Sequence, residues 1–118
     1  MTEEQLIYKI IQQSKRVEFD EVIAAIDDHY QYQKTEFSNG NEKNMILNQA
    51  GENEGSCKIF AFAMLHGLTE IQTLHCFGKY YRKDVLENPA SDSHANIRQF
   101  MKTGWKGIRY QGNALLKI

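Results

Sequence analysis

Apolar residues recur along the chain at the three- and four-residue intervals typical of short amphipathic helices. The first stripe follows Thr2 and Gln5, which have the spacing of a capping box, and it predicts a helix over residues 3–15. A second stripe predicts a helix over residues 19–30, with Asp20 as its cap. The two stripes consist of Leu6, Ile7, Ile10 and Ile11, and of Phe19, Val22, Ile23, Ile26 and Tyr30.

The period changes in the next part of the chain. The stretch "YQYQKTEFSNG" alternates imperfectly but is rich in β-favouring side chains, so it predicts a short strand that ends at Asn39-Gly40. Residues 38–56 are rich in asparagine and glycine. We expect them to form a long ordered loop or a weak second strand, and a loop of this length in a compact domain is often functional.

Three more helices are predicted in the second half. The helix that starts near residues 53–56 is apolar on most sides, so it should be central and buried. The next helix begins at a second capping box and ends at Asn88-Pro89, and the last begins at Asp92 or Ser93 and runs to about Thr103. "WKGIRYQG" predicts a second short strand. The sum is a mainly helical α+β domain over residues 1–118, with about five helices and a small two-stranded β element.

Composition excludes several classes of protein. The longest apolar run has seven residues, whereas a membrane span needs roughly 20. Two cysteines are too few for a disulfide scaffold, and they fit a reduced, cytosolic setting. Residues 1–68 carry 6 Lys/Arg and 11 Asp/Glu, and residues 69–118 carry 8 and 4. We interpret this asymmetry as attraction between the two halves of one fold, with an anionic partner for the basic half as the other interpretation.

Cys57 is a candidate for covalent chemistry. It follows a polar loop at the start of a predicted helix, where unpaired N–H groups and the helix dipole favour the thiolate. His94 would be the base, and Asn53 with the Cys57 backbone N–H would stabilise an oxyanion. Its helical spacing with Phe60 and Met64 favours a different interpretation, a small core residue.

Other ligand signatures are weak or missing. The chain has no C-x-x-C, H-x-x-x-H or H-E-x-x-H pattern and no glycine-rich phosphate loop, so neither a metal nor a cofactor is expected. Basic and aromatic residues interleave over residues 79–83, which resembles a miniature nucleic-acid patch. A solvated helix face with its tyrosines turned inward explains that stretch better.

Four blocks of sequence, read together, resemble the HopJ family of type III effector-like proteins. They are "FSNG" at 37–40, "NQAGENEGSCKIFAFA" at 48–63, "TLHCFGKYYRKDVLENP" at 73–89 and "HANIRQFMKTGWKGIRY" at 94–110. The resemblance covers roughly residues 5–115. The family is named for bacterial plant-pathogen proteins delivered by a type III secretion system, so it implies export, but it supplies no biochemical activity.

The first 15 residues argue against export in this protein. Type III signals are usually flexible and rich in serine and threonine, whereas this segment holds only Thr2 and Ser14 and predicts a good amphipathic helix. We therefore expect a cytoplasmic role.

We predict a small HopJ-like binding domain whose site lies where residues 38–56 meet the start of the third helix. An anionic group such as a carboxylate could bind at that helix end. The alternative is a cysteine-dependent hydrolase or acyltransferase, and a third class is an effector that binds a host protein. The partner is a small ligand or a protein, and the oligomeric state is left open. The expected site residues are Asn39, Asn53, Ser56, Cys57 and Lys58, joined by His94, Asn96 and Arg98 from the fifth helix.

Overall fold

The computed structural model describes all of residues 1–118 and contains five α-helices and five short strands. The α-helices are α1 (Glu3–Gln12), α2 (Phe19–His29), α3 (Glu54–Leu65), α4 (Glu70–His75) and α5 (Ala95–Thr103). The strands are β1 (Tyr30–Tyr32), β2 (Phe37–Gly40), β3 (Met45–Asn48), β4 (Ile108–Tyr110) and β5 (Leu115–Lys117). Three further turns are the 3-10 segments η1 (Ser14–Arg16) and η3 (Gly104–Gly107) and the π-helical segment η2 (Tyr80–Val85).

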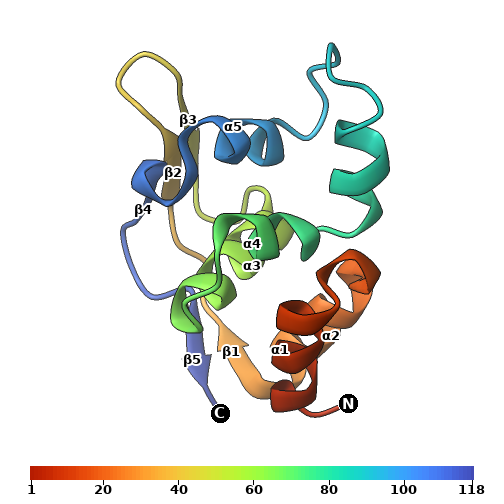
Figure 1. Cartoon of the computed structure of the whole chain (residues 1–118). Helices are drawn as coiled ribbons and strands as arrows, with labels where there is room; N and C mark the ends of the chain where they lie inside the picture. The colour runs from red at the N-terminus through yellow and green to blue at the C-terminus, as the bar shows by residue number, and fades with distance from the viewer.

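The strands form two separate antiparallel sheets. β1 pairs with β5, and β2 lies between β3 and β4. Figure 1 shows the two-stranded sheet beside the chain ends and the three-stranded sheet at the opposite end, with α3 and α4 between them. The mainly helical α+β prediction is confirmed, and the β part is larger than the expected two-stranded element.

One additional strand, β3, follows a turn that the sequence pattern did not locate, and the others are β5 and a break of the first predicted strand into β1 and β2. Of the two alternatives for residues 38–56, a long loop or a weak second strand, the strand forms, because β3 pairs with β2 in a tight hairpin. The side-chain Oδ1 of Asn41 accepts hydrogen bonds from the backbone N–H groups of Lys43 and Asn44, at 3.1 Å and 2.9 Å. This local bonding closes the turn, because an asparagine side chain can mimic a backbone turn. Gly40 precedes it with a φ of 131°, a conformation that glycine adopts without steric cost.

α3 is the central helix, as its apolar sequence predicts. Five of its residues are buried, and Phe60 lies at the centre of an aromatic cluster. The Phe60 ring centroid is 4.9 Å from that of Phe100 and 5.4 Å from that of Phe77. These contacts belong to one core of 24 buried residues, which holds both sheets and all five helices around α3.

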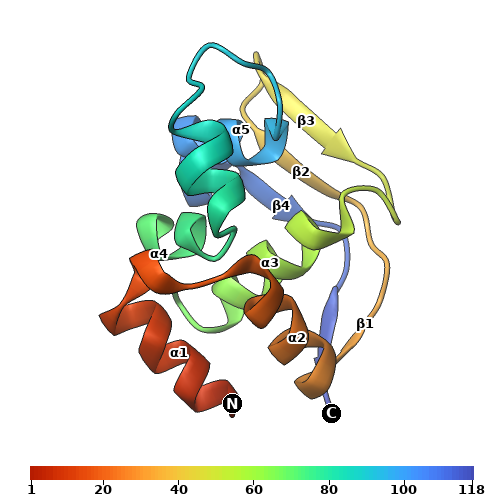
Figure 2. The ribbon, with the colours of Figure 1, turned by 90° about the vertical axis from the view of Figure 1, so that its right-hand side faces the viewer.

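The predicted fourth helix is broken in the structure. α4 ends at His75, and η2 begins only at Tyr80. Gly78 lies between them with a φ of 59°, and a Cβ atom there would lie 2.7 Å from the backbone nitrogen of Phe19. The close approach of the α2 start to this point therefore bends the chain and requires glycine. It also turns η2 toward the start of α5 (Figure 2).

Helix capping differs from the sequence prediction at α2 and at α5, whose N-cap is His94 and not Asp92 or Ser93. The boxes at Thr2 and Thr69 form as expected. α2 is capped by Glu18, with Glu21 completing the box, and not by Asp20, which lies inside the helix. None of the helices has the length and apolarity that crossing a bilayer would require.

Candidate functional site

Four asparagines from four elements join in one hydrogen-bonded network. Asn39 on β2 donates from Nδ2 to the carbonyl oxygen and the Oδ1 of Asn96 on α5, at 2.9 Å and 3.1 Å. Asn48 on β3 and Asn96 exchange side-chain hydrogen bonds of 3.1 Å and 2.9 Å. Asn53, which caps α3, donates to Asn48 Oδ1 at 2.7 Å. The network therefore fixes the starts of α3 and α5 against the three-stranded sheet.

Burial makes this network costly to disturb. Asn39 and Asn48 are 0% and 1% exposed. A buried amide group without a hydrogen-bond partner lowers the stability of the folded state, so buried amide groups are almost always hydrogen-bonded. One acceptor remains unpaired, since Asn39 Oδ1 is buried without a hydrogen-bond partner.

A pocket of about 150 Å³ lies beside the network. Residues from three elements line it, and none of them is acidic. On the α5 side the lining includes the first three residues of the helix. The full lining is Ile46 from β3, Asn53 and Ser56 from the start of α3, and His94, Ala95, Asn96 and Ile97 from the start of α5.

The two helices that begin at this pocket are the two without capping boxes. Their N-cap residues are Asn53 and His94, and neither side chain makes a capping hydrogen bond. They are also the only non-glycine residues with positive φ, at 50° and 53°. By contrast, α1, α2 and α4 begin elsewhere with the residues of a capping box, and the Thr2 and Thr69 hydroxyl oxygens accept from the N–H groups of Gln5 and Gln72, both at 3.1 Å. The first-turn N–H groups of α3 and α5 thus lack the side-chain acceptors that α1 and α4 have.

His94 borders the pocket and is held from outside it. Its Nε2 lies 3.1 Å from Asp84 Oδ2, and its ring centroid is 5.2 Å from that of Tyr80. Both partners belong to η2, so the π-helical segment orients the histidine.

Two predicted site residues point elsewhere. Lys58 pairs with Asp27 at 2.8 Å and lies 4.9 Å above the Tyr32 ring, on another side of α3. Arg98 donates to the carbonyl oxygens of Ser93, Pro89 and Asp84. The arginine therefore holds together the loop that leads from η2 to α5, and the pocket lining contains neither cation.

Cys57 lies in the core and does not line the pocket that His94 borders. It is 1% exposed, and Tyr110 Oη donates to its backbone carbonyl at 2.6 Å. Burial raises the pKa of its thiol, against the weaker opposing effect of the neighbouring tyrosine hydroxyls. These observations favour the core interpretation of Cys57 over the nucleophile.

This placement of Cys57 predicts a low thiol reactivity. In the folded protein at pH 8, iodoacetamide should alkylate Cys57 roughly a hundredfold more slowly than in guanidinium, because the thiolate is the nucleophile. Cys76 is an internal control, since it is also buried and its pKa is raised to about 12. Peptide mass mapping over time reads both sites separately. Fast labelling of Cys57 alone in the folded state would revive the nucleophile interpretation.

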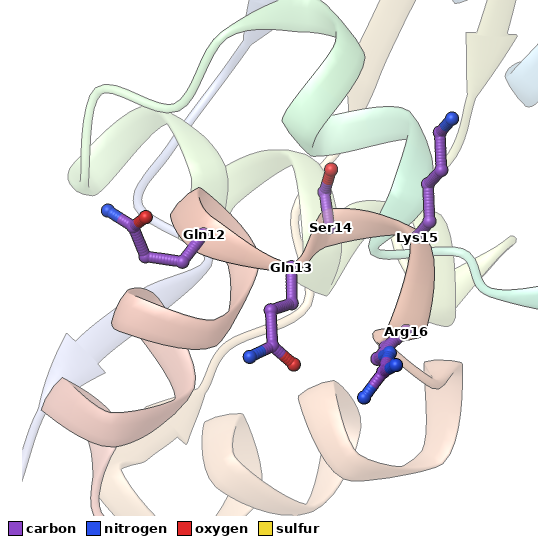
Figure 3. Close-up of a pocket in the computed structure, with 5 residues that line it drawn as sticks. All are labelled: Gln12, Gln13, Ser14, Lys15 and Arg16. Atoms are coloured by element: carbon purple, nitrogen blue, oxygen red, sulfur yellow. The ribbon is translucent and has the colours of Figure 1, made fainter.

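A larger hollow of about 530 Å³ lies over residues 12–16. All of its lining side chains come from one turn of chain, and in Figure 3 they point in different directions. No apolar residue lines it. Since its side chains do not converge on a common point, we do not regard this hollow as a binding site.

Asn48 is the network residue that the sequence analysis missed. It follows the apolar pair Ile46-Leu47, and because the weak second strand expected within residues 38–56 had no bounds, nothing placed Asn48 on the inward face of a strand. The alternation of Ile46 and Asn48 on one face was the available signal, but four residues are too few to establish a period of two.

The fold and this site together define a mainly helical α+β protein with a polar pocket at two helix N-termini, supported by a buried asparagine network. The HopJ type III effector protein family matches residues 3–115, and the chain belongs to this family. A solved structure described as that of an unknown function protein, VPA0580, is similar at 42% identity with a TM-score of 0.95. The match covers 100% of this chain and 95% of that chain. The comparison with curated proteins gave no match.

Proposed function

We propose that this protein is a small binding domain, and that its ligand presents a carboxylate or similar anionic group to the pocket between β3, α3 and α5. The observation that carries the proposal is the contrast in capping. The three helices that begin elsewhere have capping boxes, whereas α3 and α5 begin at the pocket without a capping hydrogen bond.

The chemistry of the pocket fits an anion. The N-terminus of an α-helix carries a partial positive charge and unpaired N–H groups, and these bind anions. Two such ends meet here, and no acidic side chain is part of the lining. Of the nearby acids, Glu52 Oε1 accepts from the Gln49 N–H at 2.8 Å, and Asp84, which does not line the pocket, has its Oδ2 3.1 Å from His94 Nε2.

The asparagine network gives the pocket a fixed shape. Asn53 and Asn96 line the pocket and are also members of the network. A site that is held in advance by buried hydrogen bonds binds with a smaller loss of conformational entropy. This supports the proposal that the pocket is formed before the ligand arrives.

An NMR titration tests the proposal. We expect sodium acetate, added at constant ionic strength, to shift the backbone amides of Ser56, Ala95, Asn96 and Ile97 in a saturable manner. The amides that follow the capped N-termini at Thr2 and Thr69 should not shift, since their N–H groups already have acceptors.

A variant that carries its own carboxylate sharpens the test. Ser56→Asp puts a negative charge in the first turn of α3, where it should compete with acetate and weaken binding by about tenfold. Ser14→Asp, in η1, is the matched control and should bind acetate like the wild type. Shifts that spread evenly over the surface, or equal binding by both variants, would contradict the proposed site.

A further inference from the structure

β3 is an edge strand with unpaired backbone groups. In the three-stranded sheet it has β2 as its one neighbour. The Asn41 N–H donates to the Asn44 carbonyl, and the register then makes Asn39–Ile46 and Phe37–Asn48 the hydrogen-bonded pairs. The backbone N–H and C=O groups of the residues between, Met45 and Leu47, therefore point away from β2.

The side chains of Met45 and Leu47 are also only half-buried. Met45 is 56% exposed and Leu47 is 49% exposed. Figures 1 and 2 show β3 at the outer edge of its sheet. Proteins usually protect an edge strand of this kind, because its free groups can pair with another extended chain.

The pocket opens on the inward face of the same strand. Ile46 lines it from β3, and the other lining residues come from the starts of α3 and α5. Successive side chains of a strand point to opposite faces of the sheet. In a peptide that paired with β3, every second side chain would therefore lie on the same face as Ile46. One such group would lie over the pocket.

The electrostatics of the pocket indicate which chemical group of the partner would lie over it. Two helix N-termini border it and no acid lines it, while the Nε2 of His94 is already paired with Asp84 Oδ2 at 3.1 Å. A carboxylate complements these surroundings, and an extended backbone complements the free groups of Met45 and Leu47. Backbone pairing at a sheet edge and carboxylate capture by backbone N–H groups are both established modes of peptide recognition.

We propose that the partner is an extended peptide segment that pairs with β3 and puts a carboxylate into the pocket. This inference rests on the proposed function and adds the identity of the ligand class. The carboxylate belongs either to the C-terminus of the partner or to a side chain, and the two sources share the same chemistry.

Three short N-acetylated peptides of alternating threonine and valine distinguish the sources. One has a free C-terminal carboxylate, one has a C-terminal amide, and one has the amide together with an internal glutamate. We expect at least one carboxylate peptide to bind about tenfold more tightly than the uncharged amide peptide. Binding of that peptide should shift the NMR signals of the backbone amides that line the pocket. It should also protect the N–H groups of Met45 and Leu47 from hydrogen exchange.

Leu47→Pro is the discriminating variant. Its N–H points away from β2, and proline is tolerated at such edge positions, so the fold should persist. The variant should bind acetate like the wild type and lose peptide binding. Acetate binding with no peptide binding overturns this inference and leaves the proposed function standing. Equal peptide binding by Leu47→Pro also overturns it, and so does dimerisation through β3 that excludes the peptides.

Discussion

Replacing Asn48 with alanine should lower the free energy of unfolding by about 2–4 kcal/mol, because each buried polar group left without its partner costs about 1–3 kcal/mol. Asn48 Oδ1 accepts from both Asn53 and Asn96, so the substitution removes the acceptor of two amide groups. It also removes a donor to Asn96 Oδ1. Chemical denaturation in urea measures the loss.

Asn113→Ala is the control for this prediction. Asn113 is exposed and makes no side-chain hydrogen bond within the protein, so its replacement should change the stability by less than about 0.5 kcal/mol. If the two variants lose the same stability, the network does not hold the starts of α3 and α5 in place. The proposal that the pocket is formed in advance would then also fail.

The sequence predicted those features that depend on neighbouring residues. The capping boxes at Thr2 and Thr69 are local, and both form. The burial of α3 was predicted because apolar residues cover most of its circumference, and a helix of this kind has to lie inside. Asn53, Ser56, His94 and Asn96 were also singled out and line one small pocket, and Asn39 is bonded to Asn96 in the network beside it.

The features that were missed depend on residues distant in the chain. The role of Asn48 requires Asn96, 48 residues away. Asp84 orients His94 only because the chain bends at Gly78, where the backbone of Phe19 approaches. The hydrophobic pattern of residues 69–88 contains no sign that the Phe19 backbone approaches Gly78. The pattern therefore predicted an unbroken helix. Lys58 and Arg98 were placed at the site by proximity in sequence, but their partners Asp27 and Ser93 draw them away.

Cys57 illustrates the limit of a motif. Its position at the start of a helix after a glycine-rich loop fits an activated thiol. The structure places it instead beneath Tyr110, with 1% exposure. Ser56, one residue earlier, lines the pocket. A rotation of one residue on a helix, about 100°, therefore separates a site residue from a core residue.

Replacing Phe60 with alanine should have the largest effect of any change considered, a loss of about 3–5 kcal/mol in the free energy of unfolding. The Phe60 ring is fully buried and meets four aromatic rings, those of Phe37, Phe77, Phe100 and Trp105. These rings come from β2, the α4–η2 connection, α5 and η3. Removing the ring leaves a cavity that so many separate elements cannot fill together.

The size of this loss matters because a domain of this kind has only about 5–15 kcal/mol of stability. If Phe60→Ala does not fold, Phe60→Leu keeps most of the volume and should lose less than the alanine variant. Leu65→Ala is the control on the same helix, since Leu65 is 58% exposed, and it should lose less than about 1 kcal/mol. Equal losses at Phe60 and Leu65 in urea denaturation would mean that the aromatic cluster does not organise the core. Because Phe37 on β2 and Phe100 on α5 contact Phe60 and belong to the elements that carry Asn39 and Asn96, the loss of the ring should also disturb the pocket.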